Sequence, residues 1–256
     1  MTQGPSLGSS LSPGWQGWLQ DSLTTRRVQH LLRVKRPMQS PQGPQVRVDG
    51  CWLHNFCSND YLGLANEPVL AETLASAARS MGVGAGAAGL VCGHHQAHEA
   101  LAEELADWLG VESVLLFGNG YLANVGVLQA LVTKGDGIFQ DRLNHASLLD
   151  GGLASGARHQ RYGHADAADL ARRLGADVSR RRLIVSDGVF SMDGDLAPLS
   201  ELVACARQHD ALLMLDEAHA FGVLGEQGRG SVAHFGLATD AVPLRIGTLG
   251  KAFGVY

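Results

Sequence analysis

Short apolar runs alternate with helix-like segments from Ser113 to the end of the chain, and this alternation restricts the fold more than any other feature. Such alternation predicts an α/β fold with a mostly parallel sheet flanked by helices on both faces. In sheets of this kind, ligands bind beyond the carboxyl ends of the strands, so we expect a site in the loops that follow the apolar runs. The expected strands, in chain order, are SVLLF, GIFQD, HQRY, LIVSD, ALLMLD and PLRIGT.

The first part of the chain is organised differently. Residues 1–14 are rich in Gly, Ser and Pro, which predicts a flexible tail. Residues 15–56 predict a helix over 15–36, ending before Pro37, and then an extended segment. A large domain is expected over residues 57–256.

Composition excludes several classes of protein. With 45% hydrophobic and 18% charged residues in 256, the chain can bury a core. A formal charge of -5 argues against a nucleic-acid binder and against an anionic-membrane binder. Neither a signal peptide nor a long apolar span is present, so we expect a soluble cytoplasmic protein. The cysteines are too few and scattered for a disulfide scaffold, and reduced thiols are expected at Cys51, Cys57, Cys92 and Cys205.

A glycine-rich stretch lies between two predicted helices, one opened by Pro68 and one over residues 96–109. It matches the GxGxxG pattern at Gly84, Gly86 and Gly89. In nicotinamide-binding proteins a strand precedes this pattern and an acidic residue closes the next strand. Neither condition is met, so a close-packed backbone crossing or a ligand-facing loop is the preferred interpretation.

A group of metal-ligand types follows this stretch. His94 and His98 are one helical turn apart, with Cys92 and His95 nearby. The local sequence is not HExxH, and no distant Cys/His pair completes a site. A solvated helix start is therefore preferred, and no metal is predicted.

The strongest chemical signal comes from three residues that follow apolar strands. Asp216 ends ALLMLD, and His219 follows shortly after it. A carboxylate in this position is costly to bury unless a cation or strong donor meets it, although a helix N-cap is an alternative role. Lys251 follows the next apolar strand, in GTLGKAFG. Together they indicate a lysine amine that forms a Schiff base with an aldehyde cofactor, whose protonated pyridine nitrogen pairs with the aspartate.

Further polar residues follow other expected strands. His145 comes after GIFQD and either lies flat on the cofactor ring or caps a helix. Ser191 lies just past LIVSD, on the same rim. Gly120 and Tyr121 begin the helix after SVLLF, where backbone N–H groups suit a phosphate, and Thr248 offers a hydroxyl.

Five motifs occur in order along the chain: FCSNDYLGL, LNHASLLDG, SDGVFSMDGDLAPL, LDEAHAFGVLGEQGRG and GTLGKAFG. Together they resemble the α-oxoamine synthases, a family of fold-type I pyridoxal-phosphate enzymes, and look most like its biotin-pathway branch. The resemblance implies that residues 57–256 form a domain that binds pyridoxal 5'-phosphate, and that two identical subunits form a homodimer. Because the family continues well beyond its lysine motif, the C-terminal part, with a small domain, is expected to be absent from these 256 residues.

The resemblance also implies an activity, a decarboxylative condensation of L-alanine with a pimeloyl thioester on coenzyme A (pimeloyl-CoA) or acyl carrier protein. Lys251 would hold the cofactor and then remove the Cα proton. Asp216 would keep the pyridine nitrogen protonated, and His145 would stack on the ring. Four further residues carry binding roles: His219 and Ser191 at the phenolic oxygen, Asn59 near the amino-acid carboxylate, and Arg33 near the acyl substrate.

Other interpretations stay open at this point. Within the family, the glycine C-acetyltransferase, 5-aminolevulinate synthase and serine palmitoyltransferase branches share the motifs. A different alternative is a truncated, non-catalytic paralogue that binds cofactor weakly or pairs with a complete subunit.

Overall fold

The computed structural model describes residues 11–255, which divide into two compact units. Unit 1 comprises the described residues up to Ser40 together with Gln45–His54. Unit 2 comprises Pro41–Pro44 and the chain from Asn55 onward. Most of the predicted tail at residues 1–14 lies outside the described residues.

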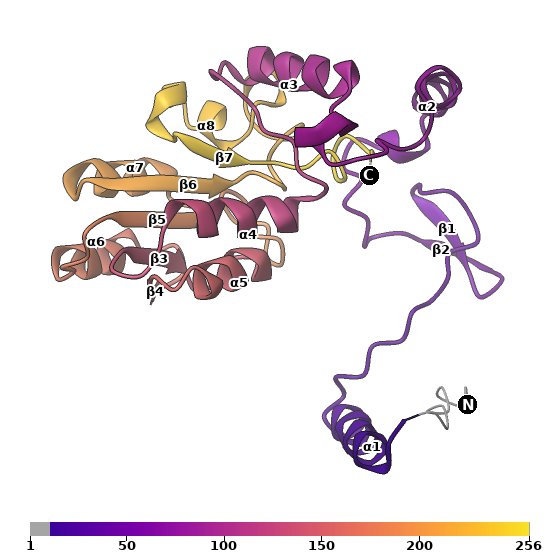
Figure 1. Ribbon diagram of the computed structural model, residues 1–256, viewed down its shortest axis with the longest axis horizontal. Coiled ribbons are helices and arrows are strands. Elements are labelled where there is room, and N and C mark those ends of the chain that lie inside the picture. Colours follow the sequence, from indigo (N-terminus) through magenta and orange to yellow (C-terminus); the bar gives the residue numbers. More distant parts are fainter. Residues whose placement is uncertain (1–10, 256) are drawn as a thin grey trace. The chain divides into compact units, whose positions relative to one another are not determined.

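Unit 1 contains a helix and a hairpin (Figure 1). Helix α1 spans Pro13–Val28 and ends earlier than predicted, because the chain turns at His30, where φ is 56°. Strands β1 (Gln45–Val48) and β2 (Cys51–His54) pair antiparallel. Asp49 and Gly50 join them with φ of 50° and 79°, the left-handed conformation that a tight hairpin turn requires.

Unit 2 is built on a five-stranded parallel sheet in the order β4-β3-β5-β6-β7, which confirms the predicted α/β fold (Figure 1). The strands are β3 (Gly137–Asp141), β4 (Arg158–Tyr162), β5 (Arg182–Asp187), β6 (Ala211–Asp216) and β7 (Leu244–Ile246). The helices that connect and cover them are α4 (Gly120–Leu131), α5 (Ala146–Ala154), α6 (Ala167–Gly175) and α7 (Leu199–Gln208).

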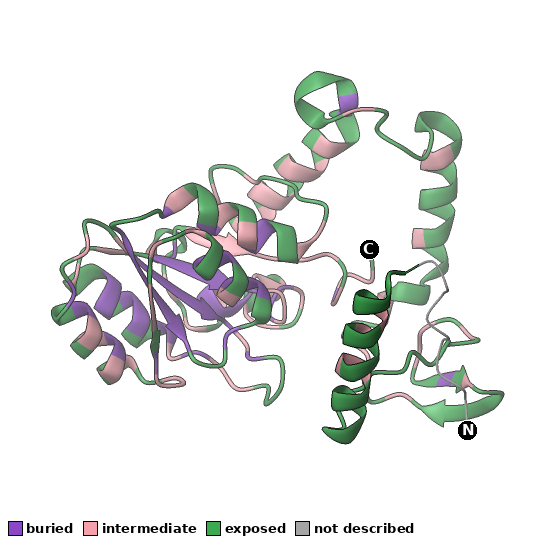
Figure 2. Cartoon of the chain, turned by 60° about the horizontal axis from the view of Figure 1, so that its bottom comes forward, coloured by how far each residue is buried: buried purple, intermediate pink, exposed green. Residues whose placement is uncertain are grey.

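Two apolar clusters cover the two faces of this sheet, and buried residues gather on its strands (Figure 2). Side chains alternate between faces along a strand, so consecutive residues enter different clusters. Leu183 and Val185 pack with Leu128 of α4 and Leu148 of α5. Ile184, between them, packs in the other cluster, which includes residues of α6 and α7. This two-sided burial explains why the strands are almost continuously apolar.

The remaining elements of unit 2 are mostly short. Helices α2 (Pro68–Met81) and α3 (Gln96–Leu109) lie where the sequence predicts them, and neither contains a fully buried residue. Between residues 11 and 255, no helix is both long and apolar enough to cross a membrane. The other elements are η1 (Leu64–Asn66), the π-turn η2 (Gly89–Gly93), η3 (Glu226–Gly228), α8 (Ser231–His234) and η4 (Thr239–Ala241).

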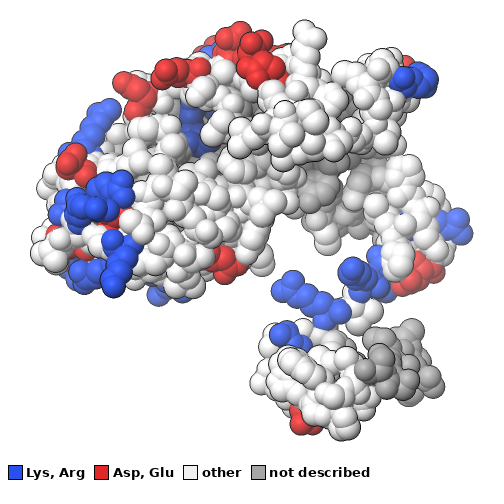
Figure 3. Space-filling view, in the orientation of Figure 1, with Lys and Arg blue, Asp and Glu red and all other residues white. Residues whose placement is uncertain are grey.

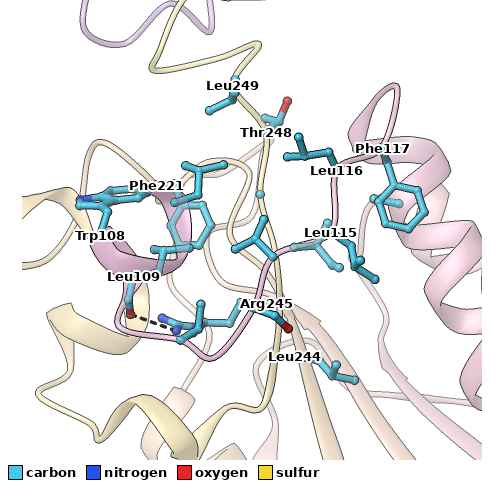
Figure 4. Close-up of a pocket in the computed structure, with 18 of the residues that line it drawn as sticks. Trp108, Leu109, Leu115, Leu116, Phe117, Phe221, Leu244, Arg245, Thr248 and Leu249 are labelled. Carbon is cyan, nitrogen blue, oxygen red and sulfur yellow. Dashed lines mark hydrogen bonds between the residues drawn. The ribbon is translucent and has the colours of Figure 1, made fainter. Parts of the chain in front are cut away.

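One predicted strand is wrong. The segment SVLLF at residues 113–117 forms no strand, and Leu115 in it is 80% exposed. A strand exists only where a neighbouring backbone supplies hydrogen bonds, and no strand among the described residues pairs with this segment. It borders a cavity of about 930 Å³ whose other wall includes β7 and Phe221, which packs edge-on against Trp108 (Figure 4).

A buried carboxylate at the amino-terminal edge of the sheet is paired with arginine side chains. Asp136, which precedes β3, accepts hydrogen bonds from Arg180 and Arg181, and these guanidinium groups lower its pKa. The burial of Asp136 is therefore explained by these ion pairs, in contrast to the acids at the opposite edge of the sheet.

The surface charges of unit 2 are also separated. On the face shown in Figure 3, basic side chains gather over α6 and acidic ones over α3.

Candidate active site

The carboxyl ends of the parallel strands bring most of the predicted residues to one edge of the sheet. Asp187 ends β5 and lies in register with Asp216, which ends β6. Asp216 is in turn in register with Ile246 of β7, just ahead of Thr248 and Lys251. The predicted residues Asp216, Thr248 and Lys251 therefore follow neighbouring strands at one edge of the sheet.

A chain of hydrogen bonds, here the outer chain, runs from Lys251 to Asn59. Lys251 Nζ lies 2.8 Å from His219 Nε2, and His219 Nδ1 lies 2.6 Å from the Tyr61 hydroxyl. The Tyr61 hydroxyl donates to Asn59 Oδ1 at 3.4 Å. A protonated Lys251 can only donate, so His219 Nε2 accepts from it, and the proton of neutral His219 is on Nδ1, toward Tyr61.

The electrostatics of the outer chain agree with this assignment. Burial, reinforced by the charge of Lys251, lowers the pKa of His219 to about 4, so His219 is neutral at pH 7. Burial also lowers the pKa of Lys251, although Asp216 and Asp187 oppose the change. An amine with a lowered pKa releases its proton more readily, as a nucleophile or general base requires.

A second set of hydrogen bonds, here the inner chain, runs from Asp216 to His145. Asp216 Oδ2 accepts from Asn124 Nδ2 at 2.7 Å, and the same amide donates to Ser147 Oγ at 2.9 Å. Ser147 Oγ lies 2.6 Å from His145 Nδ1. Asp216 Oδ1 accepts from the backbone of Ala218 at 2.9 Å. A turn and no helix follows Asp216, so the alternative role of a helix N-cap is wrong.

His145 occupies the helix cap that the sequence analysis gave as one of its two roles. It is the N-cap of α5, and its side chain accepts from the backbone N–H of Ser147. Its backbone N–H donates to Asp187 Oδ2 at 2.8 Å. The residue is exposed, so stacking on a cofactor ring stays a prediction that the cap does not exclude.

Asp187 is a second buried acid beside the lysine, and sequence reasoning missed it. It is 5% exposed, and burial together with the charge of Asp216 raises its pKa to about 8. Its backbone N–H donates to Asn144 Oδ1 at 3.1 Å. The signal was available, because Asp187 closes LIVSD as Asp216 closes ALLMLD.

The start of α4 lies beside Thr248, where a phosphate was predicted. Asn119 caps the helix by accepting from the Leu122 N–H at 2.9 Å. A Cβ atom added to Gly120 would lie 3.9 Å from Thr248 Cβ, so these two residues are neighbours. The Tyr121 hydroxyl instead donates to Asp150 at 2.6 Å. Backbone N–H groups at a helix start, next to a hydroxyl, suit an anion.

Two predicted residues lie neither in these chains nor at the start of α4. Ser191 is exposed in the turn after Phe190, and its hydroxyl has no hydrogen bond to another described residue. Arg33 is exposed and lies in unit 1. Their roles stay predictions. Within residues 11–255, no group of three or more His, Cys, Asp or Glu side chains is arranged to hold a metal ion.

Comparisons with known proteins identify several relatives. The chain is 55% identical over 234 residues to the 8-amino-7-oxononanoate synthase of Nitrosococcus oceani, covering 91% of this chain and 62% of that protein. Serine palmitoyltransferase from S. paucimobilis with bound PLP-myriocin aldimine is 28% identical with a TM-score of 0.86, covering 94% of this chain and 61% of that one. For 8-amino-7-oxononanoate synthase from Francisella tularensis, the values are 29% identity, TM-score 0.68, and coverages of 78% and 55%.

These relatives confirm the predicted resemblance to the α-oxoamine synthases. The chain spans about three fifths of the length of the curated relatives it matches. A match to the family described as Aminotransferase class I and II covers residues 53–256, most of the chain and the whole edge that carries Asp216 and Lys251. The chain belongs to the aminotransferase class I and II family.

Proposed function

We propose that the protein uses pyridoxal 5'-phosphate to condense L-alanine with a pimeloyl thioester, with release of CO2 and of the carrier thiol, to 8-amino-7-oxononanoate in biotin biosynthesis. The thioester is carried by coenzyme A or by acyl carrier protein. The observation that carries the proposal is the Lys251 amine, 2.8 Å from a neutral His219 and at the sheet edge of Asp216. The 55% identity to an 8-amino-7-oxononanoate synthase supports this choice of substrates.

The chemistry of the residues at this edge fits the cofactor. Pyridoxal 5'-phosphate supplies an aldehyde that bonds to an amine and a ring that withdraws electrons when its nitrogen is protonated. The Lys251 amine suits the aldehyde, and the buried Asp216 carboxylate suits the ring nitrogen. The start of α4 at Gly120, with Tyr121 and Thr248 beside it, suits the phosphate. Residues 57–256 thus form the proposed cofactor-binding domain.

Each side chain then has a task in the condensation. Lys251, whose pKa burial lowers, takes the Cα proton of the amino acid and later returns a proton. Asp216 holds the proton on the ring nitrogen, and His145 lies against the ring face. The remaining proposed roles are His219 and Ser191 at the phenolic oxygen, Asn59 at the amino-acid carboxylate and Arg33 at the acyl substrate.

A serine palmitoyltransferase activity is the second candidate, because such an enzyme superimposes with a TM-score of 0.86. The two candidates differ in the amino acid they take. Titration of the cofactor-loaded protein with alanine, glycine and serine separates them by the change in the visible spectrum. We expect alanine to give the largest change at the lowest concentration, and a preference for serine would overturn the assignment.

We also propose that the protein is a homodimer in the cytoplasm. Large apolar side chains are exposed in unit 2, among them Phe56 at 92%, Val83 at 95% and Leu90 at 103%. Exposed apolar surface of this kind is often covered by a second subunit. All four cysteines are unpaired, as expected in a reducing compartment.

Borohydride trapping tests the proposal directly. Pyridoxal 5'-phosphate added to the 256-residue protein should give a visible absorbance band, and reduction should fix the cofactor to Lys251, as seen by peptide mass spectrometry. Lys251→Ala should abolish the label, whereas Lys134→Ala, at an exposed lysine, should leave it unchanged. A label on other lysines, or none on Lys251, contradicts the proposed function.

A further inference from the structure

We infer that Asn124 is a positioning residue, which joins Asp216 to His145 and fixes the proton arrangement of the inner chain; its link to the cofactor rests on the proposed function. Asn124 lies on α4 and is 2% exposed. The surrounding helix sequence, GYLANVGVLQAL, is otherwise largely apolar. A buried amide is unfavourable unless it is hydrogen-bonded, so this position requires a partner.

The partners of Asn124 are both acceptors. One N–H group of its amide donates to Asp216 Oδ2 at 2.7 Å, and the other donates to Ser147 Oγ at 2.9 Å. Its Oδ1 atom is buried and has no hydrogen-bond partner in the described part of the chain. The reversed amide would place Oδ1 against the Asp216 carboxylate, where two acceptors would repel. The Asp216 anion therefore sets the orientation of the amide, at the cost of an unpartnered oxygen.

The same reasoning fixes the proton on His145. The backbone N–H of Ser147 points at His145 Nδ1 at 3.3 Å, and a backbone N–H can only donate. His145 Nδ1 is therefore an acceptor. The Ser147 hydroxyl, which already accepts from Asn124, donates its own proton to Nδ1 at 2.6 Å. Neutral His145 consequently carries its proton on Nε2, the ring nitrogen outside the inner chain.

The direction of the side-chain hydrogen bonds in the inner chain thus follows from one charge. Asp216 orients Asn124, Asn124 turns the Ser147 hydroxyl toward His145, and this hydroxyl adds a second donor to the backbone N–H that already selects the tautomer. Asn124 and Ser147 are buried, so water does not compete for these hydrogen bonds. Asn124 therefore links Asp216, which we propose at the ring nitrogen of the cofactor, to His145, which we propose at the ring face.

Asn124→Asp tests this inference without a change of shape. The oxygen that replaces the amide nitrogen next to Ser147 accepts a hydrogen bond, and the two acids share a proton at the Asp216 side. The Ser147 hydroxyl then donates to residue 124, so His145 Nδ1 loses the hydroxyl donor and keeps only the backbone N–H of Ser147. Nitrogen-15 NMR of the cofactor-free, full 256-residue protein at neutral pH detects this loss, because the chemical shift of an acceptor ring nitrogen depends on the hydrogen bonds that it accepts.

We expect wild type with the proton on Nε2, and we expect the Nδ1 resonance to move in both Asn124→Asp and Ser147→Ala, toward the value of a ring nitrogen that accepts fewer hydrogen bonds. Gln129→Ala removes an exposed amide from the same helix and should leave the Nδ1 resonance unchanged. If Asn124→Asp does not fold, Ser147→Ala still tests the central step. An unchanged Nδ1 resonance in a folded Asn124→Asp variant, or in Ser147→Ala, overturns the inference.

Cofactor titration separates this inference from the proposed function. We expect Asn124→Asp to weaken binding of pyridoxal 5'-phosphate by about 10- to 100-fold, because Asp216 shares its charge with a second acid. Wild-type affinity in a variant whose Nδ1 resonance has moved would refute the link to the cofactor. If wild type itself does not bind the cofactor, the proposed function fails, and the NMR result alone decides whether Asn124 orients the hydrogen bonds to His145.

Discussion

The inner and outer chains meet at the same sheet edge but differ in what supports them. The middle residues of the inner chain, Asn124 and Ser147, are 2% and 0% exposed and belong to helices that cover the sheet. The outer chain passes through Tyr61, which is 44% exposed, and ends at the exposed Asn59. Water competes for the hydrogen bonds at the Tyr61 end of the outer chain but not for those of Asn124 in the inner one. The hydrogen bonds of Asn124 should therefore contribute more to stability.

The largest effect on cofactor binding is expected from Asp216→Asn, which removes the charge that orients the inner chain. A hydrogen bond to a charged group contributes about 1.5–3 kcal/mol, so we expect the dissociation constant for pyridoxal 5'-phosphate to rise about 10- to 150-fold. Fluorescence titration measures this change. Asp107→Asn, at an exposed acid on α3, is the control and should bind as wild type. Wild-type affinity in Asp216→Asn would place the ring nitrogen elsewhere.

An effect of intermediate size is expected on the pH dependence of stability. His219 of the outer chain and Asp187, which contacts the inner chain, should change stability in opposite directions as pH rises. His219, in the outer chain, has a folded-state pKa of about 4, below its ordinary 6.5, so its contribution is present above pH 6.5 and is lost as pH falls through 4. Asp187, which holds the backbone of His145, has a folded-state pKa of about 8, above its ordinary 3.8. Its contribution is present below pH 3.8 and is lost as pH rises through 8.

Urea unfolding of the cofactor-free protein between pH 4 and 8 measures both contributions. Wild type should lose free energy of unfolding between pH 5 and 8, and Asp187→Asn should remove this loss. Wild type should also lose free energy of unfolding as pH falls from 6.5 to 4, and His219→Gln should reduce that loss. A full proton corresponds to a slope of about 1.4 kcal/mol per pH unit, and solvent screening makes the contribution of the partly exposed His219 smaller. Unchanged pH profiles in both variants would show that neither group is perturbed by the fold.

The smallest effect is expected from the exposed end of the outer chain. Asn59→Ala removes the acceptor of the Tyr61 hydroxyl, at a distance of 3.4 Å and in contact with water. We expect a loss of stability below about 1 kcal/mol and a change in cofactor affinity of less than about fivefold. Asn66→Ala, in η1, is the matched control. A loss as large as that of Asp216→Asn would mean that the outer chain is not the weaker one.

The parts that could be predicted from the sequence are those that depend on local pattern. Apolar strands that end in an acid predicted the sheet and the positions of Asp216 and Lys251, because parallel strands share one carboxyl edge. The strand over residues 113–117 was wrong because pairing depends on a neighbour and not on the segment alone. Asn124 was missed because its partner Asp216 is far along the chain. The one indication of Asn124 in the sequence is a single asparagine in a largely apolar helix.

Strand β7 has a consequence for the lysine that follows it. It pairs with β6 through three residues, Leu244–Ile246, whereas β5 and β6 pair through six. Local opening costs least where the fewest backbone bonds must break, so amide hydrogens in β7 should exchange with solvent sooner than those of β5. Lys251, which in the proposed function exchanges one bonding partner for another, therefore follows the strand that opens most readily. Asp216, in contrast, ends β6, one of the strands that open least readily.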